Sequence, residues 1–382
     1  MNLRIAGMGW LTPLGRGLDP VWDRLLRGEQ ASAQKISDLV SDKRYSVFRV
    51  PDDALRNLPP HPRLRRASAI SRFAAAAGLD ALAQAKSTRL RQGYGQASNH
   101  QVDMNRMALV FAVSNGGIVY TKRFYHNVVE TGAQSASPLL FPETVFNAPA
   151  SHLAAILGIT GISYTLVGDG AVGVLAIKMA ADLLHNEALD FCLVVGSEEA
   201  DWLLCDAYQK WRLLKKKPPI EVFRDPPRGM ILSEGAGALL LGREGEVRID
   251  AIDAGGNFSR RLEANDIVQR ILHDLADEDA CIVASANGTF IDLAEREAIE
   301  KELPQATIYT PKPALGESVG ASAIWQIIAG AQALRTKRLP PMVNSDPHVS
   351  LSLPTTDEIS CRAAIVLSCG LNQRVAGLRL RI

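Results

Sequence analysis

The sequence predicts a layered α/β protein, and three observations lead to this prediction. Helical and strand patterns alternate along almost the whole chain of 382 residues. The strand patterns are continuous apolar runs, as in strands buried on both faces, and the alternation restarts after residue 246. With 47% hydrophobic residues, a chain of this length can bury one large α/β core or two medium ones.

The first part of the chain begins with a strand that ends in a Gly/Pro turn, LRIAGMGWLTPLG, and a short amphipathic helix, DPVWDRLLRG. An alanine-rich helix is expected at residues 64–85. The strand MALVFAVSNGGI, the helix VFNAPASHLAAILG, the strand ISYTLVG, the helix VLAIKMAADLL and the strand FCLVVGSEE follow. Residues 229–244 and 247–255 are expected to form two strands joined as a hairpin.

The second part repeats the alternation. Helix, strand, helix, strand, helix and two final strands are expected over residues 261–278, 280–288, 290–303, 306–310, 319–336, 362–370 and 375–382. Residues 30–60 and 88–104 have weaker patterns, and we interpret them as surface insertions. No low-complexity linker separates the two parts.

Composition disfavours some classes of partner. The formal net charge is +1 and the basic residues are scattered, so we expect no binding to nucleic acid or to a membrane. A small-molecule or protein partner is favoured. The five cysteines show no close pairing in the sequence, and no apolar run is as long as a membrane span or follows a charged secretory start. We therefore expect a cytoplasmic protein, with inert core thiols at Cys192 and Cys369.

The stretch Tyr164–Gly173, YTLVGDGAVG, has the spacing of a dinucleotide-binding turn. Its three glycines follow a strand and precede a helix, and Glu198 or Glu199 ends the next strand, where a ribose-binding acid would lie. The fingerprint is weak by itself, because it usually begins its domain and here an α/β sequence precedes it. A dinucleotide-binding enzyme stays open as one hypothesis.

Four further segments carry a resemblance to a known family. IAGMGWLTPLGRGLDPVWDRLLRGE, SPLLFPETVFNAPASHLAAILGITGISYT, FCLVVGSEEA and FRDPPRGMILSEGAGALLL resemble, in this order and spacing, segments of the β-ketoacyl-acyl-carrier-protein synthases. The resemblance covers nearly the whole chain. It implies the thiolase fold, with two similar halves in five αβαβα layers and a dimer as the working unit. We place the halves at residues 1–245 and 246–382.

The resemblance gives the glycine-rich turn another meaning, because these enzymes hold their nucleophilic cysteine there. At the N-terminus of the central helix, the helix dipole and nearby amide groups lower the thiol pKa and cradle the acyl oxyanion. Aligning this helix places Gly170 at the position of the cysteine. No neighbouring side chain, Asp169 included, would hold an acyl chain as a stable thioester.

The resemblance also indicates that the other catalytic positions are changed. The family uses two histidines to polarise the malonyl thioester, and Asn287 and Glu317 stand in their places. A lysine of the second histidine motif remains as Lys312, and Leu371 replaces the phenylalanine that gates the active site. No catalytic set is intact, so activity stays uncertain and we expect a non-catalytic chain when it is alone.

Structural roles are open for the same residues. Asp169 would cap the central helix, and Lys312 would pair with Glu317 or Glu234 in a buried charge network. His152, on the helix before the turn, is expected to be a hydrogen-bonded structural histidine. Residues 213–219, LLKKKPP, are most simply a solvated loop, although a basic patch there could meet an acidic carrier protein.

Three functions from different classes follow. The favoured one, which the resemblance implies, is a degenerate subunit similar to the chain length factors of type II polyketide or fatty-acid-like synthases. It would pair with an active ketosynthase and shape its acyl tunnel. The second is an enzyme that reuses Asn287, Lys312 and Glu317 for thioester decarboxylation or acyl transfer without a covalent intermediate. The third is the dinucleotide-binding enzyme.

The favoured function also implies partners and a tunnel. The partners are the ketosynthase and an acyl carrier protein, which would bring phosphopantetheine, so we expect no cofactor or metal in this chain. By resemblance, the segments SNGGIVYTKRFYHNVV and SPLLFP reach toward the partner's pocket. They offer as candidate tunnel or interface residues Asn115, Ile118, Tyr120, Tyr125, Leu139 and Leu140.

Overall fold

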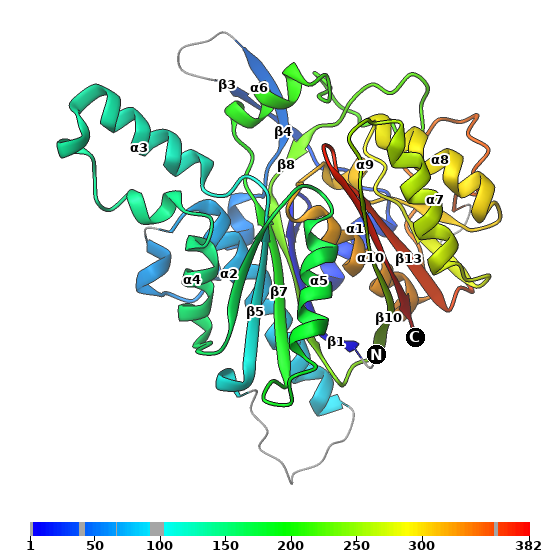
Figure 1. Cartoon of the computed structure of the whole chain (residues 1–382), viewed down its shortest axis with the longest axis horizontal. Helices are drawn as coiled ribbons and strands as arrows, with labels where there is room; N and C mark the ends of the chain where they lie inside the picture. The colour runs from blue at the N-terminus through cyan, green and yellow to red at the C-terminus, as the bar shows by residue number, and fades with distance from the viewer. Residues whose placement is uncertain (1–2, 38–42, 66, 92–102, 355–357) are drawn as a thin grey trace.

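Each half of the chain contributes five strands to one large sheet, and the two sets have the same spatial order. Figure 1 shows the arrangement of these strands and the helices around them. The structure is a computed structural model that describes residues 3–37, 43–65, 67–91, 103–354 and 358–382. The first half supplies β1 (Leu3–Thr12), β5 (Met107–Val113), β6 (Ser163–Val167), β7 (Phe191–Glu198) and β9 (Gly235–Gly242). The second supplies β10 (Val247–Asn257), β11 (Ala280–Val283), β12 (Ile308–Tyr309), β13 (Ala363–Cys369) and β14 (Arg374–Arg381).

The two sets of strands repeat one topology. The spatial order is β6-β5-β7-β9-β1 in the first half and β12-β11-β13-β14-β10 in the second. In both, the first three strands of this order are parallel and the last two pairings are antiparallel. β1 and β10 pair with each other and join the halves. The repeat confirms the predicted duplication. The second set of strands begins at Val247, and the boundary after residue 245 stays a prediction.

Helices cover and separate these strands in layers. They are α1 (Leu18–Leu26), α2 (Ala69–Arg91), α3 (Ile118–Thr131), α4 (Ala148–Leu157), α5 (Val172–Leu183), α6 (Trp202–Lys210), α7 (Glu263–Leu275), α8 (Phe290–Glu302), α9 (Lys312–Leu315) and α10 (Ser322–Thr336). α2 and α4 pack on the outer face of the first set of strands, and α7 and α8 on that of the second. α5 and α10 lie between the sets, which confirms the αβαβα thiolase fold.

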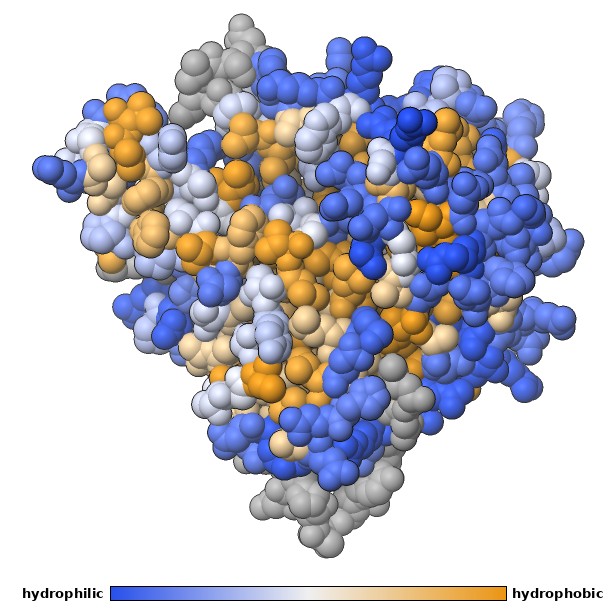
Figure 2. All heavy atoms as spheres, in the orientation of Figure 1, coloured by the Kyte–Doolittle hydropathy of each residue, from blue (hydrophilic) through white to orange (hydrophobic). Residues whose placement is uncertain are grey.

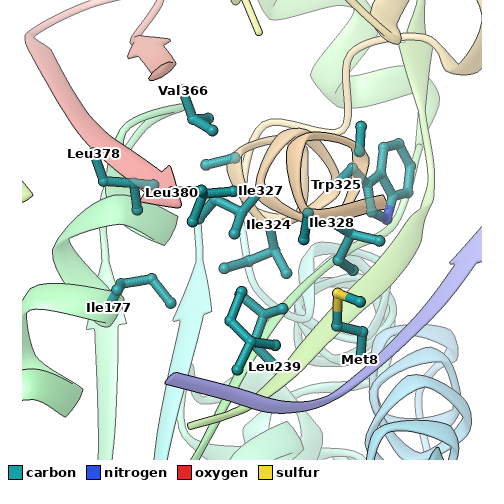
Figure 3. Packing of buried hydrophobic residues seen from close by; sticks show 14 of the residues in the cluster. Met8, Ile177, Leu239, Ile324, Trp325, Ile327, Ile328, Val366, Leu378 and Leu380 are labelled. Carbon is teal, nitrogen blue, oxygen red and sulfur yellow. The ribbon is translucent and has the colours of Figure 1, made fainter. Parts of the chain in front are cut away.

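The central layer, formed by α5 and α10, is apolar because strands of both halves pack against it. Figure 3 shows Ile324 and Ile327 of α10 between Leu239 of β9 and Leu380 of β14, with Ile177 of α5 nearby, and all of these side chains are fully buried. A helix that faces a sheet on two sides has to be hydrophobic nearly all round. The helix α5 follows the loop after β6, and α10 follows the segment after β12 that contains α9. These two connections form the candidate site.

The predicted hairpin between residues 229–244 and 247–255 is wrong. β9 and β10 do not pair, because β1 lies between them, and Ile5 of β1 is in register with Leu241 on one side and with Val247 on the other. The short connection crosses the end of β1 so closely that a Cβ at Gly245, whose φ is +149°, would lie 2.2 Å from the carbonyl oxygen of Ile5. A short link between two strand patterns is typical of a hairpin. Nothing in the link itself indicates that a distant strand, β1, lies between the two.

The interpretation of residues 30–60 as a weakly structured insertion is also wrong. They contain β3 (Ala33–Ser37) and β4 (Arg44–Phe48), which pair antiparallel, and β4 pairs parallel with β8 (Leu232–Ser233). A smaller strand, β2 (Gly15–Arg16), pairs with β1. Of the second predicted insertion, residues 92–102 lie outside the described residues, and α2 extends through residue 91. Within the described ranges, no helix is long and apolar enough to cross a membrane.

Candidate functional site

The turn between β6 and α5 places Gly170 against the loop that follows β13. Gly170 is buried, and a Cβ built on it would lie 3.3 Å from the carbonyl oxygen of Cys369 and 3.4 Å from Cα of Gly370. The hydroxyl of Ser368 donates to the carbonyl oxygen of Gly170 at 2.8 Å, which fixes the two loops to each other. A side chain at position 170 would therefore point at the loop of residues 369–373, and glycine leaves this position without a reactive atom.

Asp169 reaches into the same loop. Its Oδ2 accepts the backbone N–H groups of Asn372 at 3.3 Å and Gln373 at 3.0 Å, whereas its Oδ1 accepts that of Ala171 at 3.4 Å. A Cβ at Gly370 would lie 2.0 Å from Oδ2, so only glycine lets the carboxylate approach this closely. Burial raises the pKa of Asp169 despite these hydrogen bonds. The predicted cap of α5 is the longest of these contacts, and the main role of Asp169 is to bind the amides of the C-terminal loop.

Lys312, Glu317 and Asn287 form one buried cluster. The Nζ of Lys312 lies 2.7 Å from Oε2 of Glu317, and Nδ2 of Asn287 donates to the same oxygen at 2.8 Å. The other carboxylate oxygen, Oε1, accepts the backbone N–H of Val319 at 2.9 Å. Burial favours the neutral acid, but the charge and hydrogen bond of Lys312 outweigh it and lower the pKa of Glu317. Of the two partners predicted for Lys312, the structure selects Glu317.

Asn287 is held at both ends of its amide. Its Oδ1 accepts the hydroxyl of Thr289 at 2.6 Å, while Nδ2 is bound to Glu317. Its backbone N–H donates to Oδ1 of Asp292 at 2.8 Å, and Oδ2 of Asp292 accepts the N–H of Phe223 at 2.7 Å. These partners leave the amide of Asn287 committed within the protein, so it has little freedom to polarise a substrate carbonyl.

Leu371 lies beside a cavity of about 170 Å³ at the surface end of the same loop. The leucine is 5% exposed, and Nη2 of Arg261 donates to the carbonyl oxygen of Trp211 across the cavity wall at 3.0 Å. The residues that line the cavity are Trp211, Leu213, Phe258, Ser259, Arg261, Leu371 and Asn372. A partly apolar cavity with a cation at its rim can take a slender ligand with an anionic end.

The six candidate tunnel residues do not gather around one cavity. Asn115 lines a small cavity of about 10 Å³, which is room for one water molecule. Ile118 begins α3 and, partly buried, packs against a hydrophobic cluster built from residues of both halves. Tyr120 and Leu140 are partly exposed, whereas Tyr125 and Leu139 are 68% and 62% exposed. The structure thus separates inward-facing candidates from those at the surface of α3 and the segment after it.

Two buried acids that line the small cavity hold the start of α3. Oε2 of Glu198 accepts the backbone N–H of Ser114 at 2.9 Å, and Oε1 of Glu199 accepts that of Val119 at 3.4 Å. Burial raises the pKa of Glu198 to about 8 and that of Glu199 to about 7. The sequence marked both acids as the end of a strand and as candidates for a ribose-binding acid, and gave no sign of their contacts with α3. Tyr208 and Ser233, which complete the cavity wall, carried no sequence signal.

Gly173, the third glycine of the fingerprint, has a packing reason that needs no nucleotide. A Cβ at Gly173 would lie 2.7 Å from that of Ala323, so this glycine lets the central helices α5 and α10 approach closely. Glu198, the candidate ribose-binding acid, is 2% exposed and its carboxylate is occupied by backbone amides. These contacts argue against the dinucleotide interpretation. In the part of the chain that the structure describes, no group of three or more His, Cys, Asp or Glu side chains could hold a metal ion.

The structural expectations for His152, Cys192 and Cys369 hold, whereas the loop expected at residues 213–219 is solvated only in part, because Leu213 is buried. Nε2 of His152 hydrogen-bonds to Oε1 of Glu143, which also accepts the N–H of Ser68 through its other oxygen. Cys192 and Cys369 are buried, and burial raises the pKa of both thiols, that of Cys192 to about 12. These residues stabilise the fold and offer no nucleophile.

Comparison with known proteins identifies the family. The sequence model described as "Beta-ketoacyl synthase, N-terminal domain" matches residues 2–246. The chain therefore belongs to the β-ketoacyl synthase family. It is 23% identical over 92% of its length to the chloroplastic 3-oxoacyl-[acyl-carrier-protein] synthase I of Arabidopsis thaliana, of which it covers 79%.

Two other relatives bear on the choice between functions. The polyketide biosynthesis malonyl-ACP decarboxylase PksF of Bacillus subtilis is 24% identical over 99% of this chain and 95% of its own length. A solved structure of the ishigamide ketosynthase/chain length factor matches with a TM-score of 0.83 at 19% identity, covering 99% of this chain and 98% of that chain. At this identity the structural match establishes the fold alone.

Proposed function

We propose that this protein is a catalytically degenerate β-ketoacyl synthase-like subunit, a chain length factor of a type II polyketide or fatty-acid-like synthase. It pairs with an active ketosynthase and shapes the acyl tunnel of that partner. The observation that carries the proposal is Gly170. It is buried at the elbow before α5 and directed at the C-terminal loop, so the scaffold of the nucleophile is kept and the nucleophile is missing.

The electrostatics of the site support a loss of catalysis. Condensation develops negative charge on a thioester oxygen, which needs free hydrogen-bond donors. Here the donors of Lys312 and Asn287 are bound to Glu317, and amides of the C-terminal loop are bound to Asp169. Two carboxylates therefore occupy the positions that would otherwise receive an anion, and their charge opposes the transition state.

The surface supports pairing with another subunit. β6 lies at the end of the strand order and, among the described residues, pairs only with β5, with Tyr164 47% and Val167 53% exposed. Figure 2 shows hydrophobic residues gathering on the face that carries α3 and α5. An uncovered edge strand next to an apolar surface invites pairing with a second chain. The ishigamide structure contains a ketosynthase and a chain length factor, and our proposal extends such a pair to this protein.

A carrier protein is the second proposed partner. Its phosphopantetheine supplies the thioester, and this chain contributes no cofactor of its own. The loop that holds Lys216 and Lys217 is exposed and adjoins Leu213, which lines the cavity beside Leu371. Two exposed lysines near this opening are suited to meet the acidic surface of a carrier protein.

The first prediction tests the missing nucleophile. After incubation with acyl-phosphopantetheine donors, the isolated protein is expected to keep its unmodified intact mass, because no thiolate lies at position 170 and burial raises the pKa of Cys205 and Cys369. Product is expected only when an active ketosynthase is added. A stoichiometric acyl adduct on Cys205, Cys369 or any serine of this chain contradicts the proposal.

Gly170→Cys is the matched variant for this test. The Cβ contacts of 3.3 and 3.4 Å allow a cysteine with only a small shift of the loop, so the variant changes chemistry more than packing. We expect it to give no detectable condensation alone, since Asn287 and Glu317 cannot replace two histidines. Robust turnover by this single variant would show that the donors of the site are sufficient and that the chain is a catalyst lacking only its thiol.

A non-covalent malonyl-thioester decarboxylase is the second candidate, and the match to the Bacillus decarboxylase over 99% of this chain favours it. The commitment of Lys312 and Asn287 to Glu317 argues against it. Release of CO₂ from malonyl-carrier protein by the isolated chain separates the two. Decarboxylation without a ketosynthase supports this candidate, and decarboxylation only with the partner supports the chain length factor.

The second prediction concerns product length. We expect at least one of Ile118→Ala, Tyr120→Ala and Leu140→Ala to shift the partner's products to longer chains. A side chain that blocks the end of the acyl tunnel limits chain length, so its removal lengthens the tunnel while the dimer persists. Removal of side chains that only pack costs stability, about 2–5 kcal/mol for a fully buried leucine, without changing length. The measurement is product mass together with complex recovery. Val129→Ala on the exposed surface of α3, where Val129 is 68% exposed, is the control. If no variant lengthens the product, the subunit is a scaffold without a measuring role.

A further inference from the structure

The pairing of β11 with β13 brings two cysteines together. Cys281 is fully buried on β11, in register with Ala364 of β13. Cys361 precedes β13, at a turn where the N–H of Arg362 donates to the carbonyl oxygen of Asp279 at 3.1 Å. The turn holds Cys361 against the hydrophobic cluster that contains Cys281. The two residues are eighty positions apart in the chain, and only the fold joins them.

The two thiols are unlike each other. The hydrogen bond from the thiol of Cys281 lowers the pKa of Cys361, and the same contact, with burial, raises the pKa of Cys281. The ammonium group of Lys337 also favours a thiolate at Cys361, and its Nζ donates to the carbonyl oxygen of Cys361 at 3.1 Å. Cys361 is only partly buried. It is therefore suited to attack, and Cys281 is suited to resolve, as in dithiol pairs generally.

The other cysteines lack this environment. Cys192, Cys205 and Cys369 are buried, and burial raises the pKa of each thiol. A reactive thiol needs both access and a stabilised thiolate. Of the described cysteines, Cys361 combines the two.

We propose that Cys361 and Cys281 form a redox-active dithiol that exchanges with small-molecule disulfides. The thiolate of Cys361 attacks one sulfur of the disulfide, forms a mixed disulfide and expels one thiolate, which takes up a proton. Cys281 then loses its proton to the second leaving group and attacks the sulfur of Cys361. The products are two small thiols and one intrachain disulfide, so the electrons lost by the two cysteines reduce the small disulfide.

The geometry favours closure of this bond. The N–H of Arg362, next to Cys361, donates to the carbonyl oxygen of Asp279, close to Cys281 in the chain, so the two segments that carry the cysteines lie side by side, and the pairing of β11 with β13 fixes their backbones. The disulfide would tie β11 to the segment that enters β13. The inference is independent of the proposed partner and of the loss of catalysis at Gly170.

The test treats the native full chain with 4,4′-dithiodipyridine, a small neutral disulfide whose thiopyridone product absorbs light. We expect release of two thiopyridones per chain, no retained adduct, and an intact mass lower by two hydrogens. Peptide mapping should place the cross-link between Cys281 and Cys361. One thiopyridone with a retained adduct on Cys361, or no reaction at Cys361, would overturn the proposal.

Variants separate the two steps. Cys361→Ser is expected to abolish release, whereas Cys281→Ser is expected to release one thiopyridone and keep the adduct on Cys361. Cys205→Ser, which removes a buried thiol elsewhere, should behave as the native chain. If Cys281→Ser does not fold, the wild-type stoichiometry and the mapped cross-link still decide the question. Unchanged double release from Cys361→Ser contradicts the assignment.

Discussion

Replacing Lys312 by methionine is expected to destabilise the folded protein by about 3–5 kcal/mol, because it leaves the carboxylate of Glu317 buried without its counter-ion. The side chains of Lys312 and Glu317 are only 3% and 2% exposed, so solvent cannot take over the lost interaction. Methionine keeps the length and apolar stem of lysine, which limits any cavity effect. The measurement is the midpoint of urea unfolding, compared with the wild type at one pH.

Two controls isolate the ion pair. Lys178→Met breaks the pair of Lys178 with Asp182 on α5, whose side chains are 39% and 57% exposed, and should cost less than about 0.5 kcal/mol. Adding Glu317→Gln to Lys312→Met removes the stranded charge while keeping an amide near Asn287, and should recover part of the loss. Equal effects of Lys178→Met and Lys312→Met would show that the cluster is not the buried network described above.

The outcome also separates structure from catalysis. If Lys312 only neutralises Glu317, a Lys312→Met protein that still folds should support the partner ketosynthase as well as wild type does. If Lys312 acts on a thioester, product formation should fall further than the folded fraction. The short contacts among Lys312, Glu317 and Asn287 lead us to expect the first result.

Much of the fold could be predicted because its elements are long and strongly patterned. The strand β5 is apolar at every position, β7 is apolar except for Ser197 and Glu198 at its end, and α10 is apolar over most of its surface, so these elements could be recognised as buried. Strand neighbours could not be predicted in the same way. The position of β1 between β9 and β10 depends on pairing across more than two hundred residues, whereas local patterns favoured a hairpin.

At the site, the sequence allowed the position of Gly170 to be predicted by aligning one helix, and the proposal that a nucleophile is missing there rests on that alignment. The contacts that these residues make could not be predicted in the same way. The contact of Asp169 with the amides of Asn372 and Gln373 joins loops some two hundred positions apart, and nothing local indicates it. For Glu198 the sequence suggested a contact with a ribose, because the residue is an acid at the end of a strand. In the structure its carboxylate accepts hydrogen bonds from backbone amides instead.

These contacts also make the residues of the site depend on one another. Once Asp169 binds the C-terminal loop, an acyl oxygen cannot use the same amides, and Gly370 must remain glycine to admit the carboxylate. Lys312 compensates the buried charge of Glu317. The carboxylates of Asp169 and Glu317 are thus satisfied within the protein, which supports the proposal of a subunit without catalytic activity of its own.

A charged residue on the β6 edge is expected to weaken association with the ketosynthase by roughly 100-fold or more, since an unpaired carboxylate buried in an interface costs several kcal/mol. Val167→Asp is the variant of choice. Val167 is 53% exposed at the end of β6, so the change should leave the isolated fold intact. Product formation by the pair should fall with association. Sedimentation velocity of the mixed subunits, with circular dichroism of each alone, measures both effects.

Leu262→Asp provides the matched control for this variant. Leu262 is 88% exposed, and it immediately precedes α7, which packs on the strands of the second half and lies away from β6. The same apolar-to-acid change there should leave association unchanged, so a selective loss in Val167→Asp would assign the interface to the edge strand. If both variants bind the ketosynthase as tightly as wild type, or if the wild-type chain stays monomeric at micromolar concentration with the partner present, β6 is not the pairing edge. In that case its exposed valine and tyrosine would need another cover, because an apolar edge left open would promote aggregation of the chain.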